Sequence, residues 1–141
     1  MELDELYTDL ILEYSRSDAY RKPLLHPNVR MRGVNPSCGD NIELELQVED
    51  NLIKEVAILD TGCAISQASA AMMAELIEGK TVEEAKSLAE TFIGMIQKTV
   101  TQEELLKVLE EARAFQNIGN MPARVKCAVL SWHTLQEALQ E

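Results

Sequence analysis

The feature that most constrains the fold is a strict alternation of apolar and polar residues over positions 42–49. The alternating residues are Ile42, Glu43, Leu44, Glu45, Leu46, Gln47, Val48 and Glu49. A period of two places the apolar set on one face of a strand and the polar set on the other. Asp50 and Asn51 then indicate a turn, and the segment LIKEVAILD follows. We therefore predict an antiparallel hairpin with one buried face.

Segments with helical periodicity lie on both sides of this hairpin. Apolar residues at helical spacing predict an amphipathic helix at the start of the chain, ending near Arg16. Residues 17–37 contain three prolines and one glycine, which predicts an irregular segment with one short strand over 29–34. A helix rich in small side chains begins at about Ser66, and Gly79 is well placed to end it. This helix can pack within the domain or against a partner.

Three more helices are predicted in the second half of the chain. Thr81 and Glu84 form a capping box for a helix that reaches about residue 98. Thr101 and Glu104 predict a second helix in the same way, followed by a loop over 116–121. Pro122 suits the first turn of the last helix. The apolar face of the helix that follows Thr101 comprises Leu105, Leu106, Val108 and Leu109. The apolar face of the last helix comprises Val125, Ala128, Val129, Trp132, Leu135 and Leu139.

These elements predict one α+β domain over residues 1–141. Its small antiparallel sheet has three strands, and the helices pack on one face of that sheet. A chain of 141 residues with 46% hydrophobic content is long enough to bury a core of its own.

The charge of the chain disfavours two classes of partner. Thirteen basic residues against twenty-four acidic ones give a net charge of −11, which repels nucleic acids and anionic membrane surfaces. No apolar run approaches the roughly 20 residues that span a bilayer, and the first residues do not resemble a signal peptide. We therefore expect a soluble cytoplasmic protein with no nucleic acid or membrane partner.

Three cysteines and one aspartate form the candidate site. Cys38 precedes the outgoing strand of the hairpin and Cys63 follows the returning strand, so both lie at the same end of it. Asp40 is two residues from Cys38, and Cys127 lies near the start of the last helix, where the helix dipole favours a thiolate. Zinc takes four tetrahedral ligands, usually sulfur and nitrogen and sometimes a carboxylate. Three thiolates and one carboxylate complete such a shell.

A purely structural role for these four residues remains open. Cysteines are often buried as small apolar residues, and a Gly-Asp pair is common in turns. The histidines are poorer ligand candidates, because His26 lies in the proline-rich segment and His133 is about 240° around the helix from Cys127.

The three cysteine-bearing segments resemble a known family. NPSCGD (35–40), GCAISQASA (62–70) and RVKCAVLSW (124–132) resemble, in this order, the motifs of the IscU/NifU N-terminal family, which assembles iron–sulfur clusters. The resemblance covers nearly the whole chain and implies the IscU/NifU-like fold. The segment GCAISQAS and the extra helical sequence over 101–120 resemble the SufU branch of Gram-positive bacteria. Lys126 stands where IscU proteins have a histidine, and residues 121–126 replace their chaperone-recognition motif.

The resemblance implies a sulfur-transfer function. It implies that Cys38, Asp40, Cys63 and Cys127 bind Zn²⁺, and that Cys38 accepts persulfide sulfur from a pyridoxal-phosphate cysteine desulfurase of the SufS type. A zinc-dependent sulfurtransferase of this kind is a sulfur carrier rather than a stand-alone enzyme, and it passes sulfur to an iron–sulfur assembly complex. Arg124, one helical turn before Cys127, is a second candidate catalytic residue because its positive charge complements an anionic site.

Two other functions remain open at this point. The same four side chains can serve a scaffold on which a labile [2Fe–2S] cluster is built, with iron in place of zinc. They can also form a structural zinc site with no reactive thiol.

Overall fold

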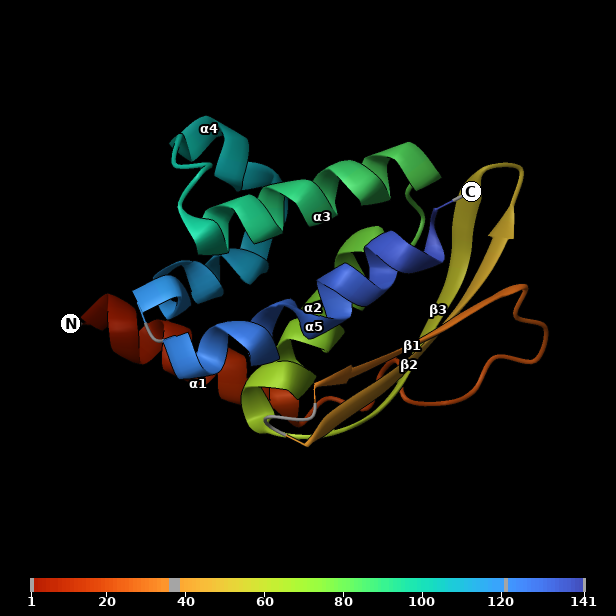
Figure 1. The fold of residues 1–141 in the computed structure, drawn as a ribbon, viewed down its shortest axis with the longest axis horizontal. Coiled ribbons are helices and arrows are strands. Elements are labelled where there is room, and N and C mark those ends of the chain that lie inside the picture. The colour runs from red at the N-terminus through yellow and green to blue at the C-terminus, as the bar shows by residue number, and fades with distance from the viewer. Residues whose placement is uncertain (1, 36–38, 121, 141) are drawn as a thin grey trace.

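The computed structural model describes residues 2–35, 39–120 and 122–140. Figure 1 shows helices gathered on one side of a small sheet. The elements in chain order are α1 (Glu2–Ser15), β1 (Val29–Asn35), β2 (Asp40–Glu49), β3 (Leu52–Thr61), α2 (Ala64–Ile77), α3 (Val82–Gln97), α4 (Glu103–Leu106), the 3₁₀ segment η1 (Lys107–Asn120) and α5 (Pro122–Ala138). Among these residues, no helix combines the length and the apolar character that a bilayer span requires.

The predicted hairpin is present, and it forms part of a three-stranded antiparallel sheet. The strands lie in the order β1-β2-β3, so each one pairs with its neighbour in the chain. Asp50 and Asn51 connect β2 to β3 with φ angles of 55° and 66°. Two successive positive φ angles are typical of the tight turn whose twist matches that of the flanking strands. The short strand predicted over 29–34 is confirmed as β1.

The alternation in β2 separates a helix-facing side from an opposite side, as predicted. Ile42, Leu44 and Leu46 are at most 1% exposed and belong to the main core. On the opposite side Glu43 is exposed, whereas Glu45 is buried. The carboxylate of Glu45 accepts a hydrogen bond from the backbone N–H of Leu24 at 2.9 Å, so the segment between α1 and β1 contacts this face.

Helix α2 is the central helix of the domain. It packs against α1, α5 and β3, so its small side chains serve packing within the domain. Its buried residues are Ser66, Ala68, Ser69, Ala70, Ala71, Met72, Met73, Ala74, Leu76 and Ile77. Tyr14 attaches α1 to the rest of the domain, because its hydroxyl contacts the carboxylates of Glu75 on α2 and Glu111 on η1.

The predicted helix boundaries around α2, α3 and α5 are confirmed. Gly79 follows the end of α2 with a φ of +84°. Both bonds of the capping box between Thr81 and Glu84 are present at the start of α3. Helix α5 begins at Pro122. Of its predicted stripe, Ala128, Trp132, Leu135 and Leu139 are buried, and Val125 and Val129 pack against the core.

The helix predicted from Thr101 is wrong in its start and in its length. The cap position of α4 is Gln102, whose side chain lies 3.3 Å from the backbone N–H of Thr101. After four residues the chain continues as η1, which contains a non-helical turn at Glu110 with φ 50° and ψ −122°.

This break also changes which side chains are buried. Leu106 and Leu109 are in the core, whereas Leu105 and Val108 are about half exposed instead of sharing the apolar face. A loop was predicted over 116–121. This prediction is wrong for residues 116–120, because η1 continues to Asn120. Met121 lies outside the described residues.

A prediction concerns Gly33, where β1 packs closely against α5. A Cβ added at Gly33 would lie 2.0 Å from the side-chain oxygen of Thr134. We expect Gly33→Ala to lower the free energy of unfolding by about 1–3 kcal/mol, which is the usual cost of overpacking a core. Urea denaturation measures this change. The double variant Gly33→Ala/Thr134→Ala lacks the clashing oxygen and should recover most of the loss; an unchanged loss would contradict the packing described here.

Candidate metal centre

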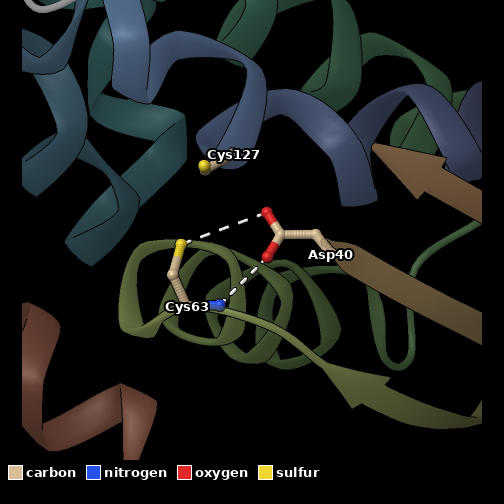
Figure 2. Close-up of side chains that lie close together, drawn as sticks. All are labelled: Asp40, Cys63 and Cys127. Carbon is tan, nitrogen blue, oxygen red and sulfur yellow. Dashed lines mark hydrogen bonds between the residues drawn. The ribbon is translucent and has the colours of Figure 1, made fainter. Parts of the chain in front are cut away.

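Three metal-ligating side chains from distant parts of the chain meet at one end of the sheet (Figure 2). They are Asp40 at the start of β2, Cys63 immediately before α2, and Cys127 in α5. One carboxylate oxygen and the two sulfur atoms all lie within 4.8 Å of one another. The described residues thus bring three of the predicted ligands together.

Asp40 is positioned by strand pairing and by a hydrogen bond to the backbone. It pairs with Asn35 across β1 and β2, and the period of two places its side chain on the same face as Ile42 and Leu44. Its carboxylate is completely buried. Oδ1 accepts a hydrogen bond from the backbone N–H of Cys63 at 3.0 Å, and Oδ2 lies 4.0 Å from the Cys63 sulfur. A buried carboxylate therefore holds the start of α2 against β2.

Gly62 makes this contact possible. A Cβ at position 62 would lie only 2.2 Å from Oδ1 of Asp40. The φ of Gly62 is +154°, which residues with a side chain rarely adopt. Glycine before Cys63 is therefore required both by the backbone and by the approach of the Asp40 carboxylate.

The two cysteines differ in their surroundings. Cys63 is the N-cap residue of α2 and is half-buried. Cys127 is 2% exposed. Helix α5 begins at Pro122, so Cys127 lies beyond the first turn, to which the dipole effect is largely confined. At this position the helix dipole gives little support to the expected Cys127 thiolate.

Among the described residues, the other side chains considered from the sequence are not part of this group. Cys38 lies outside the described residues. Arg124 is exposed in the first turn of α5, three residues before Cys127. His26 and His133 are both exposed.

The donor set fits a zinc ion or a similar thiophilic metal. Zn–S bonds of about 2.3 Å at tetrahedral angles separate two sulfur ligands by about 3.8 Å. Ligand atoms within 4.8 Å of one another therefore need to move inward by only about 1 Å to share an ion. Two sulfurs and one carboxylate leave one position of a four-ligand shell for a further donor.

A second buried carboxylate, Asp60, lies near this group and was missed from the sequence. Asp60 pairs with Ile42 and thus faces the helices, and its side chain is only 2% exposed. No described residue makes a hydrogen bond of normal geometry to either carboxylate oxygen, and the ion-pair contact of this side chain is Arg21 at 3.9 Å. Burial raises the pKa of Asp60, and the negative charge of Asp40 acts in the same direction, whereas Arg21 opposes both. The period of two in the LIKEVAILD segment, continued to Asp60, is the signal that places this carboxylate on the buried face.

The raised pKa of Asp60 predicts a pH-dependent cost to stability. Because the carboxyl binds its proton more tightly in the folded chain, its ionised form destabilises the fold above the folded-state pKa. This cost disappears below the unfolded value of about 3.9. We expect Asp60→Asn to be more stable than the parent chain at pH 7 and equally stable near pH 3.5, as measured by urea denaturation in the presence of a chelator. Glu43→Gln, an exposed carboxylate on β2, should show neither effect. An equal change in the free energy of unfolding of Asp60→Asn at both pH values would contradict the raised pKa of Asp60.

Comparisons with known proteins identify the family of this chain. Residues 22–141 match the family model described as NifU-like N terminal domain. The chain is 43% identical to the iron–sulfur cluster assembly scaffold protein IscU of Thermotoga maritima, over 96% of this chain and 94% of that protein. It is 33% identical to the zinc-dependent sulfurtransferase SufU of Bacillus subtilis, over 97% of this chain and 91% of that protein.

A solved structure agrees at the level of the fold. The crystal structure described as an iron–sulfur cluster assembly scaffold protein for the SUF system of Fervidobacterium islandicum superposes with a TM-score of 0.90 at 33% identity. It covers 96% of this chain and 98% of its own. The three-stranded sheet with helices on one face is therefore the IscU/NifU-like fold, and the chain belongs to the NifU-like N-terminal domain family of iron–sulfur cluster assembly proteins.

Proposed function

We propose that this chain is a zinc-dependent sulfur carrier of iron–sulfur cluster assembly. It accepts persulfide sulfur from a pyridoxal-phosphate cysteine desulfurase of the SufS type and passes it to an assembly complex. The observation that carries this proposal is the grouping of Asp40, Cys63 and Cys127 around a space of metal-site size. The name of the Bacillus subtilis relative, a zinc-dependent sulfurtransferase, supports it.

Cys38 completes the proposed ligand shell. It stands two residues before Asp40 in the sequence, so covalent geometry keeps their Cα atoms within about 7 Å of each other. A third sulfur from this position would give zinc three thiolates and one carboxylate, which is a shell of the usual number and kind. When bound, zinc would hold its cysteine ligands in the thiolate form near neutral pH.

The surroundings of the four residues suggest different roles. Asp40 and Cys127 are buried, and Cys63 is fixed at the start of α2, so these three act as anchors. Gly39, next to Cys38, has a φ of +72°, and among the described residues beyond its chain neighbours no atom lies within 4 Å of the place where its Cβ would be. With the other three ligands fixed, we propose that Cys38 is the ligand that reacts.

The transfer step that we propose is a thiol–persulfide exchange. The Cys38 thiolate attacks the outer sulfur of the desulfurase persulfide and forms a new S–S bond. The bond between that sulfur and the desulfurase cysteine breaks, and this cysteine leaves as a thiolate. One sulfur atom changes carrier with no net oxidation. Arg124, exposed near the start of α5, is proposed to attract the anionic persulfide. The exchange takes place in the cytoplasm, where thiols stay reduced.

A scaffold function is the second candidate, and the name of another relative favours it. The Thermotoga maritima relative at 43% identity is named as an iron–sulfur cluster assembly scaffold. The same thiolates and carboxylate can hold a labile [2Fe–2S] cluster. Lys126 favours sulfur transfer instead, because an ammonium offers only donors and cannot replace the histidine ligand of the scaffold proteins.

Cys38 provides the first test. We expect Cys38→Ala to abolish stimulation of a SufS-type cysteine desulfurase, because the acceptor sulfur is lost, while the chain stays folded. Alanine release at saturating cysteine measures turnover, and circular dichroism checks the fold. The surface variant Glu43→Ala should stimulate like the parent chain. Normal stimulation by Cys38→Ala would contradict its role as acceptor.

The same assay separates the two candidate functions. Removing zinc with a chelator should abolish stimulation, and restoring zinc should recover it. Loading the chain with iron and sulfide in place of zinc should fail to stimulate turnover. Stimulation that survives zinc removal, together with transfer of a [2Fe–2S] cluster to an acceptor protein, would favour the scaffold function.

Asp40 provides the second test. We expect Asp40→Ala to weaken zinc binding by about 10–100-fold, because one ligand and the hydrogen bond to the Cys63 backbone are both lost. Competition with a chromophoric chelator measures the affinity. Glu43→Ala on the same strand removes an exposed carboxylate and is the matched control. Equal zinc affinity for the two variants would exclude Asp40 as a ligand.

A further inference from the structure

A buried hydrogen-bond bridge connects α2, which begins directly after Cys63, to α5, which contains Cys127. Ser69 is completely buried, and its hydroxyl donates to the backbone carbonyl of Ala128 at 2.5 Å. The same hydroxyl accepts a hydrogen bond from the indole N–H of Trp132 at 3.0 Å. Ala128 and Trp132 are one helical turn apart, so one side chain of α2 connects two successive turns of α5.

The bridge lies close to both sulfur ligands along the chain. Ala128 directly follows Cys127, and Ser69 is six residues after Cys63, which is about 9 Å along α2. The rest of α2 around Ser69 is lined by small apolar side chains such as Ala68 and Ala70, which offer no directional contact. The hydroxyl thus provides a directional contact between the helices that carry Cys63 and Cys127.

The indole end of the bridge is itself held in place. Trp132 stacks on Phe92 of α3, with a ring-centroid distance of 4.4 Å and an interplanar angle of 10°. Phe92 in turn meets Phe115 of η1 edge to face. The position of Trp132 is therefore fixed by aromatic packing, and Ser69 transmits that position to α2.

We propose that Ser69 is a positioning residue of the metal centre. Its two hydrogen bonds set the distance of α5 from α2 and the rotation of α5 about its own axis. They thereby set the separation of the Cys63 and Cys127 sulfurs. This inference rests on the proposed function, because it makes Ser69 responsible for the geometry of a metal site. A purely structural role, in which the hydroxyl only satisfies the buried indole N–H, predicts the same loss of stability but no change at the metal.

Cobalt(II) is the probe that distinguishes these roles, because its absorption reports the geometry of thiolate ligands. We expect Ser69→Ala to bind Co²⁺ at least about fivefold more weakly than the parent chain, which corresponds to the loss of one hydrogen bond of about 1 kcal/mol. The thiolate-to-cobalt absorption bands should also shift in energy. Trp132→Phe keeps an aromatic ring and the hydrogen bond from Ser69 to Ala128, so it should change the absorption bands less than Ser69→Ala does.

Two variants control for effects of stability alone. Ser131→Ala removes a buried hydroxyl on α5 for which the described part of the chain offers no hydrogen-bond partner, so it should leave the cobalt spectrum and affinity unchanged. Ile53→Val trims a buried side chain near the turn of the hairpin, away from the cysteines. It should lower the unfolding midpoint without altering the cobalt bands.

A metal-free measurement tests the inference separately from the proposed function. In chelator-treated protein, the rate at which iodoacetamide modifies Cys127, followed by peptide mass spectrometry, should rise at least about fivefold in Ser69→Ala and remain unchanged in Ser131→Ala. A Cys127 rate equal to that of the parent chain, or unchanged cobalt bands and affinity, would overturn the positioning role. Failure of the parent chain itself to bind cobalt or zinc would instead contradict the proposed function, and the alkylation rates would still decide the role of Ser69.

Discussion

The site depends on the hydrogen bond from the backbone N–H of Cys63 to the carboxylate of Asp40. This contact brings the first residue of β2 and the cap residue of α2 together, although 23 positions separate them in the sequence. It requires glycine at position 62, because any side chain there would occupy the space of the carboxylate. A buried carboxylate is costly unless it is bonded, so folding and assembly of the site are coupled through this one group.

Around this contact the fold acts as a support for the metal centre. The helix-facing side of the sheet positions Asp40, the start of α2 positions Cys63, and α5 brings Cys127 over both (Figure 2). The buried bridge from Ser69 to α5 then fixes the distance between the two helices. Close packing of α2 against α5 is possible because α2 is composed largely of small side chains. The motif GCAISQAS therefore combines a proposed ligand, Cys63, with the residues that permit helix contact.

Much of this arrangement could be predicted from the sequence, because its signals are local. The period of two in 42–49, the Asp50-Asn51 turn and the capping box of Thr81 each determine a nearby bond or a face, and each is confirmed. The region after Thr101 was predicted wrongly, because a non-helical residue at Glu110 ends a pattern that is continuous in the sequence. Asp60 was missed because the period of two indicates only the face on which it lies, whereas its burial there depends on tertiary packing. The contact of Cys127 with the other ligands followed from the family resemblance, since no local signal brings α5 to the hairpin.

The proposed function requires that Cys38, Cys63, Cys127 and Asp40 bind a single zinc ion. X-ray absorption at the zinc edge of the purified chain is the decisive measurement, since this method counts sulfur and oxygen neighbours and measures their distances. We expect one zinc per chain with three sulfur neighbours at about 2.3 Å and one oxygen at about 2.0 Å. A first shell with fewer than three sulfurs, or a chain that retains no zinc, would contradict this assignment.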